Sequence, residues 1–96
     1  MIDKLDNRYR VTGRMLIADA RSLLEAGRAL LLGESDKDML LDLAAVEDAD
    51  SSALGVIFGL IRTADARGVQ IRLVNLPAGL VSLASLYGVS ESLPLA

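Results

Sequence analysis

The chain has 96 residues, of which 52% are hydrophobic and only 3% aromatic, and its formal net charge at pH 7 is −3. This length accommodates one small domain, residues 1–96, with an aliphatic core. The absence of Cys and His excludes disulfides, Cys/His zinc sites and catalytic triads that depend on imidazole. The negative net charge argues against nucleic acid as the main partner, because phosphate binding needs a basic surface.

The apolar runs are too short for the roughly 20 residues that a membrane-spanning helix needs. The longest, residues 53–61, stops at Arg62. The first residues, MIDKLDNRYRV, carry charges throughout and lack the apolar core of a signal peptide. We therefore expect a cytoplasmic protein.

The N-terminal residues predict a β-hairpin. Two short strands, residues 3–5 and 9–12, are separated by Asp6 and Asn7, and Asn is a favourable turn residue. We expect the second strand to end at Thr12–Gly13.

From Ile17 the apolar residues recur at helical spacing. Asp19 falls in the first turn, where it suits the helix dipole, and Gly33 is a plausible stop. The charged residues 34–38 then predict a solvated connection. The predicted buried face consists of Ala20, Leu23, Leu24, Gly27, Leu30 and Leu31.

The stretch from Met39 to Ile61 predicts a buried strand, a turn and a central helix. Residues 39–43 are apolar except for Asp42, and residues 47–50 are expected to form a polar turn. The next apolar run fits a helix buried on most sides, capped by Asp50 or Ser51. Gly55 and Gly59 lie within it, where we expect them to admit a neighbouring strand or helix.

The C-terminal part predicts a strand over residues 69–74, after a helix end at Arg67–Gly68. A turn follows, with Pro77 expected at the first position of a last helix. Residues 89–96 have room for a short final strand. The face of this helix expected to meet the sheet consists of Leu80, Leu83, Ala84 and Tyr87.

The predicted order is therefore β-β-α-β-α-β-α. Repeated strand–helix–strand units imply an α/β domain with a mainly parallel central sheet, right-handed crossovers and helices packed on it.

No charged residue occurs between Leu73 and Ser90. If Leu80 and Tyr87 face the sheet, Val81 and part of Leu86 must point elsewhere. We favour an interface over scattered surface aliphatic residues, because the absence of charge is complete. A homodimer surface would satisfy the same pattern.

The only cluster that suggests chemistry is Asp48, Asp50, Ser51 and Ser52 at the start of the central helix. The serines lack an imidazole base, and both lysines lie in other segments, so a small hydrolase has little support. Two aspartates without a phosphate-binding loop are a weak signal for Mg²⁺. We therefore expect no enzymatic activity and no cofactor. A phosphate on either serine would add about two negative charges and could act as a switch.

Residues 50–55, DSSALG, resemble the motif of the STAS domain (sulphate transporter and anti-sigma factor antagonist), and the order of elements matches that fold over nearly the whole chain. The family's usual motif is Asp-Ser-Ser-Gly-Leu or Asp-Thr-Gly-Gly-Leu, so Ala53 departs from it. In anti-sigma factor antagonists a partner kinase phosphorylates the second serine, which corresponds to Ser52.

Residues 83–94, LASLYGVSESLP, resemble the end of the small STAS subunit of the Mla phospholipid-transport ABC system. In that branch a threonine follows the motif aspartate, and Ser51 occupies its place. The resemblance implies a non-enzymatic subunit that binds the cytoplasmic ATPase, supports its assembly and activity, and serves lipid asymmetry at the inner face of the bacterial cytoplasmic membrane. The partner-binding residues expected on this basis are Asp50, Ser51, Ser52, Leu54, Leu80, Val81 and Tyr87.

The alternative is an anti-sigma factor antagonist that binds a serine kinase and is regulated by phosphorylation at Ser52, with Ser51 as the other candidate. The genes next to this one would discriminate the two functions.

Overall fold

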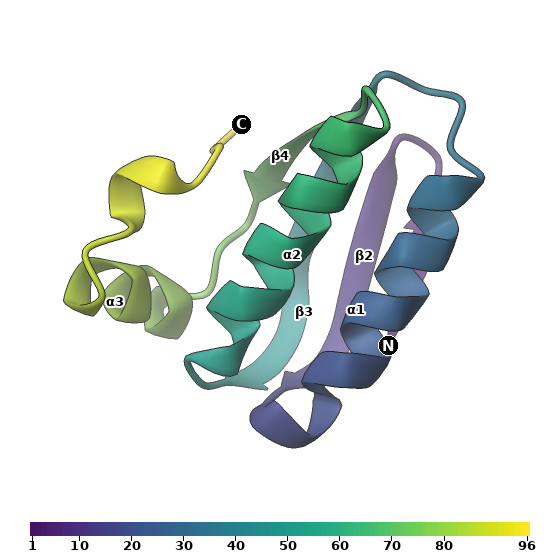
Figure 1. Cartoon of the computed structure of the whole chain (residues 1–96). Coiled ribbons are helices and arrows are strands. Elements are labelled where there is room, and N and C mark those ends of the chain that lie inside the picture. The colour runs from purple at the N-terminus through teal and green to yellow at the C-terminus, as the bar shows by residue number, and fades with distance from the viewer.

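In the computed structural model, which describes residues 1–96, four strands form one sheet in the order β1-β2-β3-β4 (Figure 1). β1 pairs antiparallel with β2, and the pairs β2–β3 and β3–β4 are parallel. The predicted order and mainly parallel sheet are confirmed. The elements are β1 (Ile2–Leu5), β2 (Arg8–Met15), α1 (Ile17–Leu32), β3 (Asp38–Ala49), α2 (Ser52–Ala66), β4 (Gln70–Val74), α3 (Ala78–Leu86) and a 3₁₀ turn (Ser90–Ser92).

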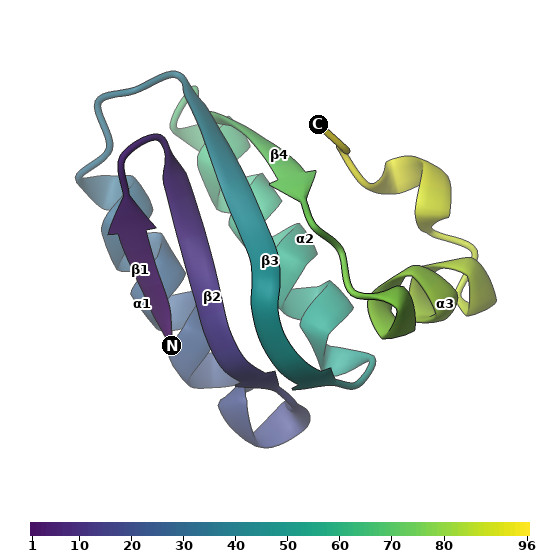
Figure 2. The same ribbon diagram turned by 180° about the vertical axis from the view of Figure 1, so that it is seen from behind.

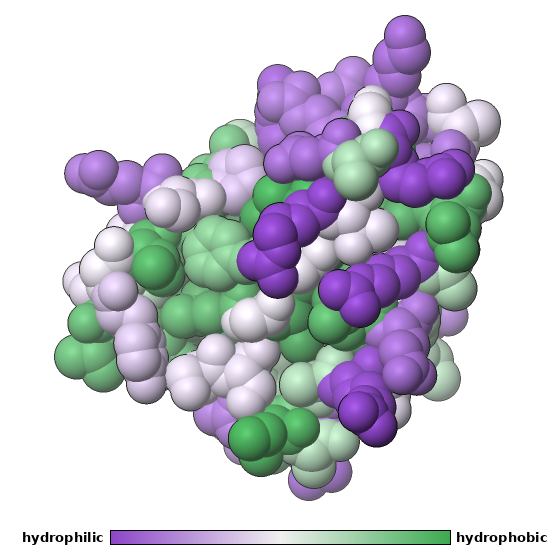
Figure 3. Space-filling view, viewed as in Figure 1, coloured by the Kyte–Doolittle hydropathy of each residue, from purple (hydrophilic) through white to green (hydrophobic).

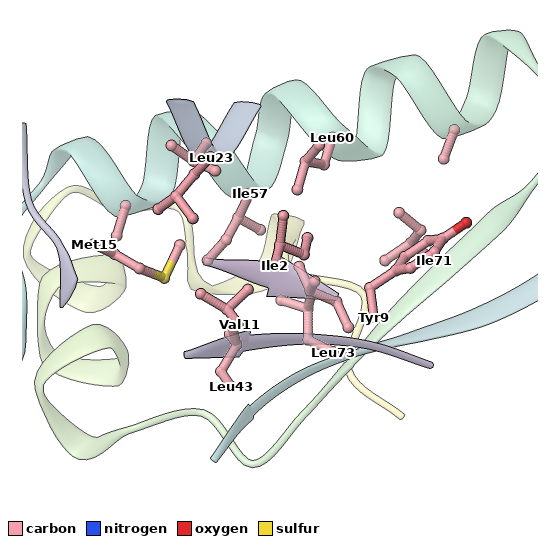
Figure 4. Packing of buried hydrophobic residues seen from close by; sticks show 14 of the residues in the cluster. Ile2, Tyr9, Val11, Met15, Leu23, Leu43, Ile57, Leu60, Ile71 and Leu73 are labelled. Carbon is pink, nitrogen blue, oxygen red and sulfur yellow. The ribbon is translucent and has the colours of Figure 1, made fainter. Parts of the chain in front are cut away.

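α1 and α2 cover one face of the sheet, and the opposite face carries no helix (Figures 1 and 2). α3 lies beyond the β4 side, beside the first half of α2. The core fills the space between the sheet and the two long helices, where Val11 and Leu43 of the strands lie near Ile57 of α2 (Figure 4). No helix combines the length and the apolar character that crossing a membrane requires.

The hairpin turn at Asp6–Asn7 is confirmed, with Asp6 in the left-handed region at φ 54°. β2 does not end at Thr12–Gly13, however. Gly13 has a φ of 90°, and the β2–β3 register shifts on either side of it. This bulge lets the strand bend and continue to Met15.

β3 is likewise longer than expected, and the predicted polar turn over residues 47–50 is wrong. Asp48 and Ala49 are strand residues that pair with Arg14 and Met15 of β2. The longer β2 supplies the partners that local composition could not reveal. The reversal into α2 therefore contains little more than Asp50 and Ser51.

Asp42 is a buried polar residue, 7% exposed, on β3. Its carboxylate accepts hydrogen bonds from Arg8 Nη1 at 2.7 Å, Asn75 Nδ2 at 3.0 Å and the Ala44 N–H at 3.0 Å. These donors, led by Asn75, lower the pKa of Asp42 to about 2. The charge thus connects β2, β3 and the turn after β4.

The predicted face of α1 is confirmed: Leu23, Gly27 and Leu31 are buried, and the other members pack against the core. The helix also ends at Gly33 as predicted.

The segment 34–38 is not only a solvated connection. The side chain of Glu34 is fully covered and accepts hydrogen bonds from the Tyr9 hydroxyl at 2.5 Å and from Lys4 Nζ at 3.1 Å. These contacts, led by that with Tyr9, lower the pKa of Glu34 to about 2. Glu34 therefore fastens the end of α1 to the hairpin.

The last helix differs in three details from its prediction. Pro77 occupies the N-cap with an extended ψ of 147° instead of the first helical position. Leu80 and Ala84 are buried as expected, whereas Tyr87 is 58% exposed. Tyr87 follows the last helical residue, and Gly88 at φ 69° turns the chain away, so its ring is not held against the sheet. The tail adds one bridge, Leu73 to Leu95, and no full strand.

Candidate functional site

Asp50 follows the last residue of β3, and its carboxylate joins the beginnings of α1 and α2. One oxygen accepts the Ile17 N–H at 3.0 Å, and the other accepts the Ser52 N–H at 2.8 Å. Burial acts to raise the pKa of Asp50, but these two backbone donors hold it below its usual value. The side chain therefore caps α2, as one of the two predicted alternatives requires, and also fixes the start of α1.

The two serines after Asp50 differ in accessibility. Ser51 is exposed and makes no capping hydrogen bond, although it occupies the N-cap position of α2. Ser52 is half-buried, and its N–H is already held by Asp50. Gly55, one turn further on, is exposed, and a Cβ there would meet nothing within 4 Å. The expectation that Gly55 admits a neighbouring element is therefore wrong, whereas Gly59 does admit Leu24 of α1.

The predicted partner-binding residues divide into accessible and buried ones. Val81 and Tyr87 are 51% and 58% exposed. Leu54 and Leu80 are 6% and 0% exposed, so their side chains belong to the core.

Two accessible features were missed by the reasoning from sequence. Ile17, whose backbone N–H binds Asp50, is 77% exposed. The available signal for its exposure was that Ile17 lies outside the set of residues predicted to form the apolar face of α1. The second feature is a groove of about 150 Å³ between the end of β3 and the start of α3. It was not predicted because residues 47–49 were expected to form a turn. It is lined by Val46, Glu47, Asp48, Ala49, Pro77, Gly79 and Leu80.

Apart from Glu47 and Asp48 at the groove, the surface on the α3 side has little charge. Hydrophobic and weakly polar side chains gather over α3 and the adjoining half of α2, and hydrophilic side chains gather over α1 (Figure 3). Leu86 and Leu95 are also exposed on this side of the molecule, at 78% and 61%. No group of three or more acidic side chains is arranged to hold a metal ion. The exposed apolar side chains on the α3 side suit binding to another surface.

Comparison with known protein families identifies the fold. The family model described as "Mlab, STAS domain" matches residues 3–95. The chain belongs to this STAS domain family. No curated protein matches the sequence.

Solved structures share the STAS fold at low sequence identity. A chain of the Acinetobacter MlaFEDB complex in an ATP-bound conformation is 20% identical, with a TM-score of 0.84 and 100% of each chain covered. A putative anti-sigma factor antagonist from Thermotoga maritima is 20% identical, with a TM-score of 0.77, over 99% of this chain and 83% of that one. The phosphorylated form of the Bacillus cell-fate determinant SpoIIAA is 13% identical, with a TM-score of 0.69, over 100% of this chain and 89% of that one.

Proposed function

We propose that this STAS domain is a non-enzymatic subunit of a phospholipid-trafficking ABC transporter. It docks on the ATPase subunit at the cytoplasmic face of the membrane and supports that subunit's assembly and activity. The family description and the full-length likeness to a chain of the MlaFEDB complex support this proposal.

One structural observation carries the proposal. The groove is lined on one side by residues 46–49, which lead directly into the turn at residues 50–52, and on the other by Pro77, Gly79 and Leu80 at the start of the uncharged helix α3. We therefore treat the turn and α3 as parts of one surface. We define this docking surface by Ser51, Ser52, Gly55, Val81 and Tyr87. A core of low charge with polar groups at its edge is characteristic of protein–protein interfaces. Asp50 contributes by holding the turn, not by contacting the partner.

The test is binding of the purified chain to the purified ATPase subunit of the Mla-type transporter from the same organism. Ser51→Asp and Ser52→Asp should each retain the fold, because a carboxylate at the N-terminus of a helix is favoured by the helix dipole, but should abolish binding by placing a second charge beside Asp50. Ser22→Asp, an exposed position on α1, is the matched control and should bind normally. Normal binding by both motif variants would remove the turn from the interface.

A second candidate function is that of an anti-sigma factor antagonist switched by phosphorylation. The hydroxyl of Ser52 lies in the motif of a fold that has been solved in a phosphorylated form in SpoIIAA. Native protein recovered from cells and examined by mass spectrometry decides between the two functions. Phosphate on Ser52, together with a co-purifying serine kinase, would favour the switch, whereas an unmodified chain bound to the ATPase and permease would favour the transporter.

A further inference from the structure

The groove between β3 and α3 has apolar walls and an acidic rim. Val46, Ala49 and Pro77 are half-buried on its sides. Glu47 and Asp48 are exposed, and no basic residue is among those that line the groove. An occupant that satisfies both parts has an apolar stem and a positive end.

The rim carboxylates are free to bind such a group. The ion pairs of the chain involve other residues, so neither Glu47 nor Asp48 is neutralised by a salt bridge. Arg14 is the register partner of Asp48 on β2 but forms no ion pair with it. One oxygen of Asp48 accepts the Ala49 N–H at 2.9 Å, which orients the carboxylate and leaves its other oxygen open.

Gly79 lines the groove without a side chain of its own. It lies in the first turn of α3, it is exposed, and a Cβ there would meet nothing within 4 Å. The fold therefore does not require glycine at this position, although glycine weakens a helix relative to alanine. Because Gly79 is a lining residue, we expect a larger side chain there to narrow the groove.

We infer that this groove receives a single lysine or arginine side chain from the partner. The aliphatic stem packs on Val46 and Pro77, and the charged end reaches Glu47 and Asp48. A groove of about 150 Å³ suits one long side chain and not a helix, which is about 10 Å across with its side chains. The inference rests on the proposed function, because it assigns this side chain to the ATPase subunit, and it adds an electrostatic anchor to a docking surface that is otherwise uncharged.

A peptide titration tests the groove without the ATPase. The probes are acetyl-Leu-Arg-Leu-amide and the same peptide with neutral citrulline in place of arginine, followed by ¹⁵N NMR at low salt. The arginine peptide should shift the amide signals of Ala49 and Gly79 and bind about tenfold more tightly than the citrulline peptide. Equal shifts from both peptides, or arginine-dependent shifts confined to other regions, would overturn the inference.

Binding to the purified ATPase subunit tests the assignment of the partner. E47Q/D48N should bind about tenfold more weakly than the unmodified chain and with a shallower salt dependence. Gly79→Leu should weaken binding by filling the groove mouth without altering charge. E25Q/D65N changes the net charge equally at exposed helical positions elsewhere and should bind normally.

The outcomes separate this inference from the proposed function. If Val81→Asp abolishes ATPase binding while E47Q/D48N has no effect, the groove takes no basic side chain and the transporter function stands. If the unmodified chain does not bind the ATPase, the transporter function fails, and the peptide titration alone decides whether the groove selects a cation.

Discussion

Gly27 of α1 lies directly against Leu60 of α2, so closely that a Cβ at position 27 would overlap the Leu60 side chain. The reciprocal contact is formed by Gly59 of α2, where a Cβ would come within 2.8 Å of Leu24 Cδ1 of α1. Each helix thus offers a glycine to a leucine of the other. This exchange sets the distance between the two helices whose first turns are joined by Asp50.

Gly27→Ala should therefore destabilise the domain by about 1–3 kcal/mol, because the added methyl group displaces Leu60 in a packed interior. Gly55→Ala is the matched control: it lies in open space within a helix and should stabilise the domain by up to about 1 kcal/mol. Urea unfolding followed by circular dichroism measures both. If Gly27→Ala stabilised the domain as Gly55→Ala is expected to do, α1 and α2 would have to separate easily enough to admit the added methyl group.

Ile57→Ala should cost about 2–5 kcal/mol through the cavity that it leaves, since Ile57 is fully buried beneath α2. Leu54→Ala should behave similarly at 6% exposure. At temperatures where each variant is still folded, its affinity for the partner should be unchanged, since neither side chain reaches the surface. A loss of affinity in a demonstrably folded variant would contradict this separation.

The stability of the domain should fall as the pH is lowered from about 5 toward 2. The pKa values of Glu34 and Asp42 are about 2 in the fold, against ordinary values of 4.5 and 3.8. The unfolded chain therefore binds protons first, and the stabilising contribution, complete above the ordinary values, is lost as the pH approaches 2. Tyr9→Phe removes the main donor to Glu34 and should reduce this dependence. Thermal unfolding across the range measures it, and an identical pH profile for Tyr9→Phe would contradict the assignment.

Asp50→Ala should lower the melting temperature more than Asp48→Ala does. Asp50 serves two helix N-termini, through the N–H groups of Ser52 and Ile17, whereas Asp48 accepts only the N–H of its neighbour Ala49. Hydrogen exchange gives a sharper measurement, since only the first change should expose the Ile17 amide. Retained protection of that amide in Asp50→Ala would contradict the joint cap.

Elements with local periodicity could be predicted from the sequence, and features that depend on distant partners could not. The spacing of Leu23, Gly27 and Leu31 was sufficient to define the buried face of α1. By contrast, Asp48 is a strand residue only because Arg14 lies across from it, and the bulge at Gly13 that extends β2 has no local signature beyond the glycine itself.

The same reason explains the partial prediction of the docking surface. The turn at residues 50–52 was recognised from its motif, and Val81 from the absence of charge. Leu80 was expected both to face the sheet and to bind a partner, and only the structure shows that burial to 0% leaves its side chain in the core, as burial to 6% does for Leu54. The groove arises where the unexpectedly long β3 reaches α3, so no single segment could reveal it.

The exposed apolar residues of α3 provide the last prediction. Leu86→Ser should leave the free energy of unfolding within about 0.5 kcal/mol, because Leu86 is 78% exposed and loses little packing. It should nevertheless weaken binding to the ATPase subunit if α3 belongs to the docking surface. Leu32→Ser is the matched control, an exposed leucine at 63% on the end of α1, and should bind normally. Equal loss of ATPase binding by both leucine variants would exclude a specific role for α3. Light scattering of the free chain tests self-association: if the unmodified chain is a dimer and Leu86→Ser is a monomer, α3 is a self-association surface.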